Sequence, residues 1–388
     1  MKKIVWLSIL LLIAFSGINA QKWVPTYSNV DYVGNGNTKQ MLDIYIPAGI
    51  TTAAKTVVHI HGGAFMMGSK GVSEQPSFQN LYNNGYVCVD INYRLSSDSI
   101  WPSQVYDCKA AIRYLKANAD LYHIDTCKIG VIGESAGGYL VSMLGTSAQV
   151  PQLEGLHLGN THVTSRVHAV VDLFGPINFL TMDAEAAALG FTINTNSPTS
   201  PESRLMGAAV QTIPELVTLA NPTTYITPDD AAFFISAGSA DQNIPYTQGQ
   251  NFCSALIPVV GSQNASFELI AGAGHGGSVW HNTTQDAKYL AFFNAALTGC
   301  NATGIKSENQ IKSKVVVYPN PVYESFTLDL KNNNIYDITV INCQGQVVFK
   351  RSDVTNAMRI SAGNLPAGIY LIKADSMSES VSATFVKQ

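Results

Sequence analysis

The feature that most constrains the fold is a regular alternation of short β-branched runs with helical patterns from Trp23 to about Thr298. Such alternation is typical of an α/β fold with an open, mostly parallel sheet. Several runs after Lys128 are almost wholly apolar, as expected for strands covered on both faces. The expected strands are Met41–Ile46, Thr56–His61, Tyr86–Asn92, Lys128–Gly133, Ala169–Phe174, Ala232–Ala237 and Ser266–Ile270, and the expected helices are Ser103–Ala119, Ala136–Ser147, Pro245–Leu256 and Ser278–Leu297.

Two changes of pattern suggest how the rest of the chain is organised. Residues 177–227, rich in Thr, Asn, Pro and Ala, predict a cap-like insertion at one sheet edge, within a domain of residues 21–300. Residues 301–314 are polar and suit a linker. Residues 315–388 carry short alternating runs with turn signals, which predict a separate small β-sandwich. Its expected strands are Phe326–Leu330, Asp337–Ile341, Gln346–Lys350, Met358–Ile360 and Ile369–Ala374.

The first twenty residues have the order of a secretory signal peptide. Lys2 and Lys3 precede an apolar run that reaches about Phe15, and small residues follow as far as Ala20. A single membrane anchor is the alternative, but the run is short for a span of about 20 residues and no stop-transfer pattern follows. We therefore expect residues 1–20 to be removed on export.

Charge is scarce and unevenly distributed. Charged residues make up 13% of the chain, about half of the usual share. Residues 21–305 hold 12 basic and 20 acidic residues, a net charge of −8, whereas the charges from Val315 onward balance at six and six. A nucleic-acid-binding protein needs a basic face, and the sequence shows none. An acidic enzyme would favour uncharged substrates over polyanions.

Six cysteines in an exported chain raise the question of disulfides, and sequence alone decides no pairing. Cys88 lies in an apolar run and is expected to be a buried strand thiol. A helix of about ten residues separates Cys108 from Cys127 by about 15 Å, beyond the reach of a disulfide. Cys253 and Cys300 come late in two helical segments that start from the same sheet edge, so a bridge between them is one expected pairing. No cysteine spacing resembles a zinc site.

The first motif that carries chemistry is Gly133-Glu134-Ser135-Ala136-Gly137. It follows an apolar strand and precedes a helical segment, the setting in which a serine is held in a strained turn with its hydroxyl exposed. A bare G-x-S-x-G pattern is weak evidence, and a βα turn with an incidental serine is the alternative. The strand–turn–helix context favours Ser135 as a nucleophile.

A second motif, His61–Phe65, follows the strand that ends near Ile60. A glycine-rich turn at this place can direct backbone N–H groups at a developing oxyanion. We expect the amides of Gly63 and Ala64 to be donors together with the amide of Ala136. His61 and Gly62 are expected to shape the turn, with His61 a hydrogen-bonded structural residue.

A serine nucleophile needs a base, and the base needs an acid that orients it. His275 follows the last expected strand within a glycine-rich loop, so it is the predicted base, and His281 is the nearest rival inside the final helical segment. Asp241 lies just beyond a strand and is the predicted acid, with Asp172 and Asp183 as alternatives. The order Ser, Asp, His is that of α/β-hydrolases, and carboxyl ends of parallel strands share one edge, where ligands bind. The other histidines are weaker candidates for the base. His59 lies in a strand, and the rest lie away from the carboxyl end of any strand: His123, His157, His162 and His168.

On these residues the chain resembles the hormone-sensitive-lipase-like esterases, in particular the branch of bifunctional feruloyl and acetyl xylan esterases. The resemblance covers nearly all of residues 25–298 and includes His61–Phe65, Gly133–Gly138, Asp107–Ala119 with Ile124 and Asp125, and Asn221–Pro222. It implies an α/β-hydrolase fold and hydrolysis of acyl esters without a metal or another cofactor. One departure is Ala64, where many relatives have a third glycine.

The C-terminal region resembles the subtype A sorting domain of the type IX (Por) secretion system. The matching segments are Val317–Pro321, Leu365–Tyr370 and Phe385–Lys387. The resemblance implies a small β-sandwich that the outer-membrane secretion machinery of a Gram-negative bacterium recognises through residues 315–388. Release or attachment at the cell surface would follow. An ordinary carbohydrate-binding or adhesion sandwich is the alternative.

Together these features predict a secreted serine carboxylesterase that acts through an acyl-enzyme. Acetyl or feruloyl esters of plant polysaccharides, or other small uncharged esters, are the expected substrates. The alternatives are a polyester or lipid ester hydrolase, a serine peptidase and a surface adhesion protein without activity. The sequence gives neither the acyl nor the alcohol group of the substrate, and residues 177–227 are expected to shape that choice.

Overall fold

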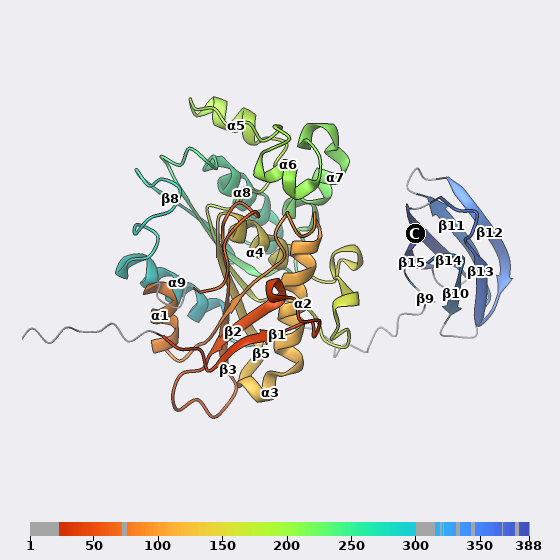
Figure 1. Ribbon diagram of the computed structural model, residues 1–388, viewed down its shortest axis with the longest axis horizontal. Helices are drawn as coiled ribbons and strands as arrows, with labels where there is room; N and C mark the ends of the chain where they lie inside the picture. The colour runs from red at the N-terminus through yellow and green to blue at the C-terminus, as the bar shows by residue number, and fades with distance from the viewer. Residues whose placement is uncertain are drawn as a thin grey trace, which may run out of the picture. The chain divides into compact units, whose positions relative to one another are not determined.

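The computed structural model describes residues 23–71, 76–299 and 315–387, apart from 319, 321, 331–333, 343–345, 367 and 377–379. The chain divides after residue 300 into two compact units (Figure 1). The predicted signal peptide and the predicted linker lie outside the described residues. In the part of the chain that the structure describes, no helix has the length and apolar character needed to cross a membrane.

An eight-stranded sheet forms the centre of the first unit, with the strand order β1-β2-β4-β3-β5-β6-β7-β8. β2 runs antiparallel to β1 and β4, and the remaining neighbours are parallel. All seven expected strands are present, and the α/β fold is confirmed; β1 was not expected. The strands are β1 (Tyr27–Asp31), β2 (Met41–Tyr45), β3 (Ala54–Ile60), β4 (Val87–Ile91), β5 (Ile124–Glu134), β6 (Ala169–Leu173), β7 (Ala232–Gly238) and β8 (Ala265–Ile270).

Helices cover both faces of this sheet (Figure 1). Successive strand residues point to opposite faces, so Val58 and Val170 pack in one core cluster while Val57 and Val171 pack in the other. The first cluster includes residues of α2, α4 and α8, and the second includes residues of α1 and α9. The helices are α1 (Pro76–Asn83), α2 (Ser103–Ala117), α3 (Ala119–Tyr122), α4 (Ala136–Thr146), α8 (Thr247–Val260) and α9 (Thr283–Ala296).

The predicted bridge between Cys253 and Cys300 is wrong, because Cys253 is a free, buried thiol. Cys253 lies on α8 and packs in the first core cluster, whereas α9, which leads toward residue 300, packs in the second. The sheet therefore separates the two helices. Cys300 itself lies outside the described residues. Cys88 is a buried free thiol, as expected; Cys108 is also free and buried, and Cys127 is disulfide-bonded.

The segment 177–227 departs from the sheet after β6 and returns before β7. It contains three short helices, α5 (Met182–Ala188), α6 (Pro201–Met206) and α7 (Pro214–Leu219). The side chain of Ser200 accepts a hydrogen bond from the amide of Ser203, and Pro201 takes the first helical position, so local sequence fixes where α6 begins.

The second unit has two antiparallel sheets around one apolar core. One sheet has the order β13-β10-β9 and the other the order β12-β11-β14-β15. Phe326, Ile338 and Phe385 are among the buried residues of the core that the sheets share. The small all-β domain that the sequence predicts is therefore confirmed, with β9 and β15 in addition to the expected strands. The strands are β9 (Val315–Tyr318), β10 (Ser325–Leu330), β11 (Tyr336–Asn342), β12 (Val347–Val354), β13 (Ala357–Ser361), β14 (Gly368–Asp375) and β15 (Ser380–Lys387).

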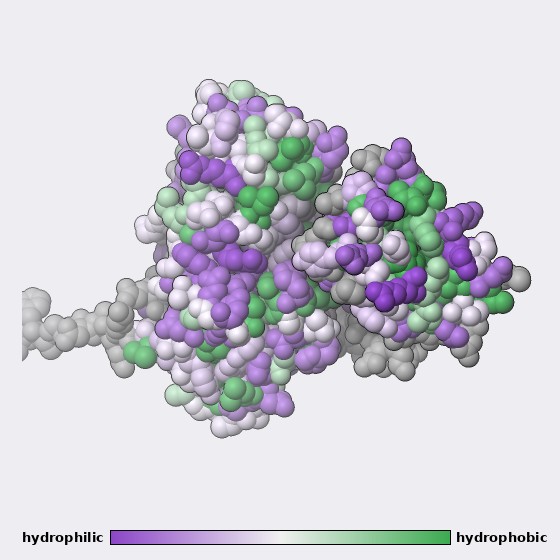
Figure 2. Space-filling model, turned by 45° about the vertical axis from the view of Figure 1, so that its right-hand side comes forward, coloured by the Kyte–Doolittle hydropathy of each residue, from purple (hydrophilic) through white to green (hydrophobic). Residues whose placement is uncertain are grey.

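The surface of the first unit is a mixture of polar and apolar residues. On the face that Figure 2 shows, hydrophobic residues stand singly or in small groups between polar ones. Met67, Ile100 and Leu219 are among the exposed large hydrophobic residues. Scattered apolar residues of this kind are normal on a soluble domain and mark no site by themselves.

Candidate active site

Ser135 occupies a tight turn between β5 and α4. Its backbone has φ 54° and ψ −118°, a conformation that non-glycine residues rarely adopt. The turn passes so close to β3 that a Cβ on Gly137 would lie 1.9 Å from the carbonyl oxygen of Ile60. Only glycine fits at position 137, and the strained turn leaves the Ser135 hydroxyl at the carboxyl edge of the sheet.

His275 connects Ser135 with Asp241 through two short contacts. Its Nε2 lies 2.9 Å from Oγ of Ser135, and its Nδ1 lies 2.7 Å from Oδ2 of Asp241. Oδ1 of Asp241 accepts hydrogen bonds from the amides of Asn243 (2.8 Å) and Ile244 (3.0 Å). The Asp241 side chain has no exposed surface, while the imidazole is 20% exposed. The structure thus brings together the three residues that the sequence suggested for a triad.

The rival residues have other contacts. Asp172 is fully buried and accepts hydrogen bonds from Ser142 Oγ (2.7 Å) and the amide of Gly175 (2.9 Å), which ties β6 to α4. Burial raises the pKa of Asp172 to about 6, against these hydrogen bonds. Asp183 accepts hydrogen bonds from Thr195 within the insertion. Neither carboxyl group contacts His275.

The turn after β3 lies against Ser135. Gly63, Ala64 and Ala136, the expected amide donors, line the same pocket as Ser135. Gly63 has φ 113°, and a Cβ there would lie 2.2 Å from the carbonyl oxygen of Met67, so this position requires glycine. Ala64 has φ 56°, a left-handed conformation that glycine adopts more easily. Alanine at position 64 still supplies a backbone amide to the turn.

The two other residues of the expected turn have structural contacts. His61 is 5% exposed and stacks on Tyr93, with ring centroids 4.3 Å apart and planes at 15°. Burial lowers the pKa of His61. A Cβ on Gly62 would lie 2.8 Å from the carbonyl oxygen of Glu134, so the turn and the nucleophile elbow are in close contact.

A buried charge network lies behind the nucleophile. His59 Nε2 is 2.9 Å from Oε2 of Glu134, and His59 Nδ1 is 2.9 Å from Oδ1 of Asp90. Burial favours neutral His59, but Glu134 and Asp90 outweigh it and raise the pKa of His59 to about 10. Burial likewise favours neutral Glu134, but His59 outweighs it and lowers the pKa of Glu134. The pair is therefore ionised at neutral pH.

His281 lies on the pocket wall and not inside a helix, so this expectation is wrong. α9 begins only after Asn282, whose side chain accepts hydrogen bonds from the amides of Thr284 and Gln285. His281 Nε2 lies 3.4 Å from Oε1 of Glu134, and its Nδ1 lies 3.0 Å from Ser77 Oγ. His281 thus links the loop that carries His275 to the residue before Ser135.

A cluster of aromatic rings in tilted and edge-to-face contact supports the imidazole from the side. The ring centroids of Phe174 and His275 are 4.8 Å apart, and those of Phe174 and Trp280 are 4.5 Å apart. Trp280 is fully buried, and its indole N–H donates to the carbonyl of Gly274 at 3.2 Å. The loop around His275 is therefore fixed by packing and by a hydrogen bond of its own.

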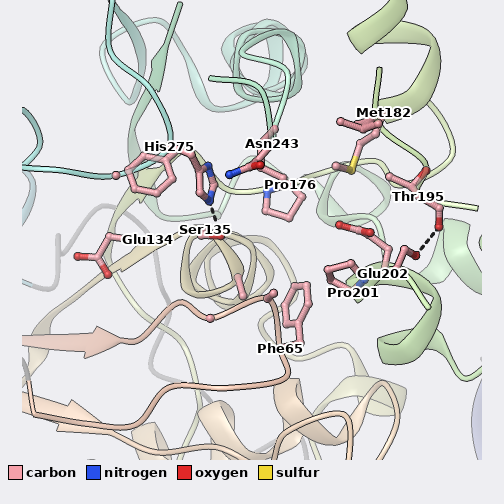
Figure 3. Close-up of a pocket in the computed structure, with 18 of the residues that line it drawn as sticks. Phe65, Glu134, Ser135, Pro176, Met182, Thr195, Pro201, Glu202, Asn243 and His275 are labelled. Carbon is pink, nitrogen blue, oxygen red and sulfur yellow. Dashed lines mark hydrogen bonds between the residues drawn. The ribbon is translucent and has the colours of Figure 1, made fainter. Parts of the chain in front are cut away.

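The triad opens into a large pocket of about 1120 Å³. Ser135 and His275 lie together on one side of the pocket, and residues of the insertion, among them Met182, Thr195 and Glu202, lie on the other side (Figure 3). Among the described residues that line the pocket there is no lysine or arginine, while Glu134 and Glu202 contribute two carboxyl groups. The insertion provides Met182, Ile193, Asn194, Thr195, Ser197, Thr199, Ser200, Pro201 and Glu202 to the lining.

Gln248, a residue of α8, binds the first two residues of this insertion, Ile177 and Asn178, which we call its root. Gln248 Oε1 accepts hydrogen bonds from the amides of Ile177 (2.8 Å) and Asn178 (2.7 Å). Its Nε2 donates to Oε1 of Glu185 at 2.9 Å. Gln248 is 2% exposed, so the contact is protected from water.

Comparison with known proteins shows to which family the chain belongs. Residues 42–256, more than half of the chain, match the BD-FAE family. The chain belongs to the BD-FAE family. Residues 316–388 of this BD-FAE protein match the secretion system C-terminal sorting domain.

Solved structures of similar fold include two proteins described as carbohydrate esterases. A truncated carbohydrate esterase from gut microbiota has a TM-score of 0.65 and 30% identity, over 72% of this chain and 98% of that one. A bifunctional GH43-CE protein of Bacteroides eggerthii has a TM-score of 0.62 and 32% identity, over 70% of this chain and 35% of that one. The α/β-hydrolase fold of the first unit agrees with both.

Curated relatives include two proteins of Mycobacterium tuberculosis. Esterase LipC is 31% identical over 240 residues, 61% of this chain and 57% of LipC. The probable carboxylic ester hydrolase LipM is 29% identical over 211 residues, 54% of this chain and 46% of LipM. The BD-FAE chain thus spans about half the length of these relatives.

Sequence reasoning missed the residues that form the wall of the pocket. Glu202, Asn243 and Met182 line the pocket, although no motif marks them. The G-x-S-x-G pattern leaves position 134 open, so it gives no sign that Glu134 contacts His59. In the described part of the chain, no group of three or more His, Cys, Asp or Glu side chains is arranged to hold a metal ion.

Proposed function

We propose that this BD-FAE protein is a serine carboxylesterase with Ser135 as nucleophile, His275 as general base and Asp241 as the acid that orients it. The observation that carries the proposal is the continuous Ser135–His275–Asp241 contact at the wall of a large pocket. The esterase and carboxylic ester hydrolase names of the relatives support the same class of reaction.

The proposed reaction proceeds in two halves. His275 takes the proton of Ser135 Oγ, which attacks the ester carbonyl carbon, and the amides of Gly63, Ala64 and Ala136 stabilise the oxyanion. His275 then gives the proton to the leaving alcohol as the C–O bond breaks. Water, deprotonated by His275, attacks the acyl-enzyme and releases the acid while Ser135 regains its proton. Asp241 keeps Nδ1 protonated and stabilises the imidazolium.

Replacement of the nucleophile tests this proposal. Ser135→Ala is expected to lower kcat for p-nitrophenyl acetate by at least about 10³-fold, because Ser135 is the serine whose Oγ contacts the proposed base His275. Ser278→Ala is the matched control, since Ser278 is an exposed serine of the same pocket. A fluorophosphonate probe should label the wild type and not Ser135→Ala. Full activity of Ser135→Ala would refute the proposal.

For the substrate, we propose acetyl or feruloyl esters of plant polysaccharides. The names of the two structural relatives support a carbohydrate ester. The absence of lysine and arginine among the described pocket residues supports an uncharged one. A panel of short and long p-nitrophenyl esters, methyl ferulate and acetylated xylan tests this choice. Preference for long acyl chains over the last two would point to a lipid ester instead.

We also propose that the protein is exported to the cell exterior or surface of a Gram-negative bacterium. The match of residues 316–388 to a sorting domain supports this, and residues 1–20 would direct the first step as a signal peptide. The outer-membrane secretion machinery would then bind residues 315–388. Deletion of residues 315–388 should leave active enzyme in the periplasm, whereas unchanged export would refute the role of this domain.

A further inference from the structure

The side of the pocket away from His275 contains a carboxyl group that the proposed reaction does not use. Figure 3 shows Glu202 on this side, next to Pro201 and Thr195. Glu202 lies in the first turn of α6 and is 6% exposed. Because Glu202 lines the pocket, a ligand that fills this end of the pocket contacts its carboxyl group.

The surroundings of Glu202 provide no countercharge. No described lysine or arginine lines the pocket, and the charged group that acts on Glu202 is Asp183, another carboxylate. Burial raises the pKa of Glu202. Hydrogen bonds from its own backbone amide and from the Ser200 hydroxyl lower this pKa, but burial outweighs them. Carboxylate oxygens can accept more hydrogen bonds than these two groups supply, and a buried carboxyl group gains from each further donor that reaches it. A bound substrate can supply such a donor.

The neighbouring wall indicates which donor fits. Asn194, Thr195, Ser197 and Thr199 line this part of the pocket and offer neutral hydroxyl and amide groups. Such groups match a neutral ligand that carries hydroxyl groups. An anionic ligand would be repelled by Glu202, because like charges at close range are unfavourable.

We propose that Glu202 accepts a hydrogen bond from a hydroxyl group at the end of the substrate far from the scissile ester, and so selects hydroxylated esters. This inference rests on the esterase activity proposed above. The hydroxyl can come from a phenolic acyl group or from a sugar alcohol, and the two sources share the chemistry that Glu202 recognises. Glu202 would act as a specificity residue, since it is remote from the reacting atoms.

Two matched pairs of esters distinguish the sources. Methyl 4-hydroxycinnamate and methyl cinnamate differ only in a hydroxyl on the acyl side. trans-2-Hydroxycyclohexyl acetate and cyclohexyl acetate differ only in a hydroxyl on the alcohol side. The wild type should prefer the hydroxylated member of at least one pair, and the pair that shows the preference identifies the source.

Glu202→Leu should lower kcat/KM for the preferred hydroxylated ester by about tenfold to a hundredfold, mainly through KM. The ester without hydroxyl should change by less than about threefold. Glu202→Gln keeps the shape and a neutral acceptor, so its loss should be smaller but in the same direction. Glu215→Gln is the matched control, because Glu215 is exposed on α7 of the same insertion.

Three outcomes would overturn the inference: no hydroxyl preference in the wild type, a preference that persists in both Glu202 variants, or equal losses on both members of a pair. If Glu202→Leu does not fold by circular dichroism, Glu202→Gln decides. A wild-type protein that hydrolyses none of the four esters, nor p-nitrophenyl acetate, would instead refute the proposed esterase activity.

Discussion

Replacement of Asp241 by asparagine tests the proposed triad at the level of a single proton. Oδ1 of Asp241 accepts two backbone amides, from Asn243 and Ile244, and Oδ2 faces Nδ1 of His275. An asparagine must place its only oxygen toward the two amides, which leaves its NH₂ group facing His275. The reverse orientation would set two buried N–H donors against an NH₂ group and cost about 2–6 kcal/mol in total.

The preferred orientation forces the wrong tautomer of His275. Nδ1 must then accept a hydrogen bond from the asparagine, so the proton moves to Nε2, and Nε2 can no longer accept the proton of Ser135. In a triad this change lowers kcat by about 10⁴-fold. By transition-state arithmetic this corresponds to about 5 kcal/mol of lost stabilisation. KM should change little, because Asp241 is buried and does not line the pocket.

The assay is steady-state hydrolysis of p-nitrophenyl acetate, with thermal melting to verify the fold. Asp183→Asn serves as the matched control, because Asp183 lies in the insertion and its contacts with Thr195 need only an acceptor oxygen. A kcat for Asp241→Asn within about tenfold of the wild type would refute the tautomer argument. So would an equal loss in Asp183→Asn.

Two further predictions concern the charge network and the cysteines. Because the pKa of His59 is raised from 6.5 to about 10, its contribution to stability is fully present below pH 6.5 and is lost as the pH rises toward 10. The melting temperature of the wild type should therefore fall over this interval, and His59→Gln should flatten the fall; parallel curves would contradict the assignment. Iodoacetamide under denaturing, non-reducing conditions should modify Cys253 and leave Cys127 intact, as peptide mass spectrometry can verify.

The sheet and the triad could be predicted because their signals are local. Each strand is a short run of mostly apolar or β-branched residues, and Ser135, Asp241 and His275 lie one, three and five residues beyond the ends of β5, β7 and β8. In a parallel sheet the carboxyl ends of strands meet at one edge, so position along the chain becomes position in space. No such rule applies to residues 177–227, whose irregular segments pack through contacts between distant residues.

Two errors have physical causes that can be named. His281 was placed inside a helix because the apolar pattern extends upstream of α9, although Asn282, a strong N-cap residue, marks the true start. The bridge between Cys253 and Cys300 was expected from helix direction alone. Helix direction does not show the face on which a helix packs, and α8 and α9 pack in different core clusters.

The hydrogen bonds of Gln248 have a consequence for how the protein can evolve. The root of the insertion is fixed by one buried side chain of α8, while the pocket wall comes from residues beyond that root. Substitutions or length changes around residues 193–202 can therefore accumulate without moving Ser135 or His275. An insertion taken from another member of the family, joined after residue 178 and before residue 227, would give a chimera with a different pocket wall and an unchanged Ser135–His275–Asp241 contact.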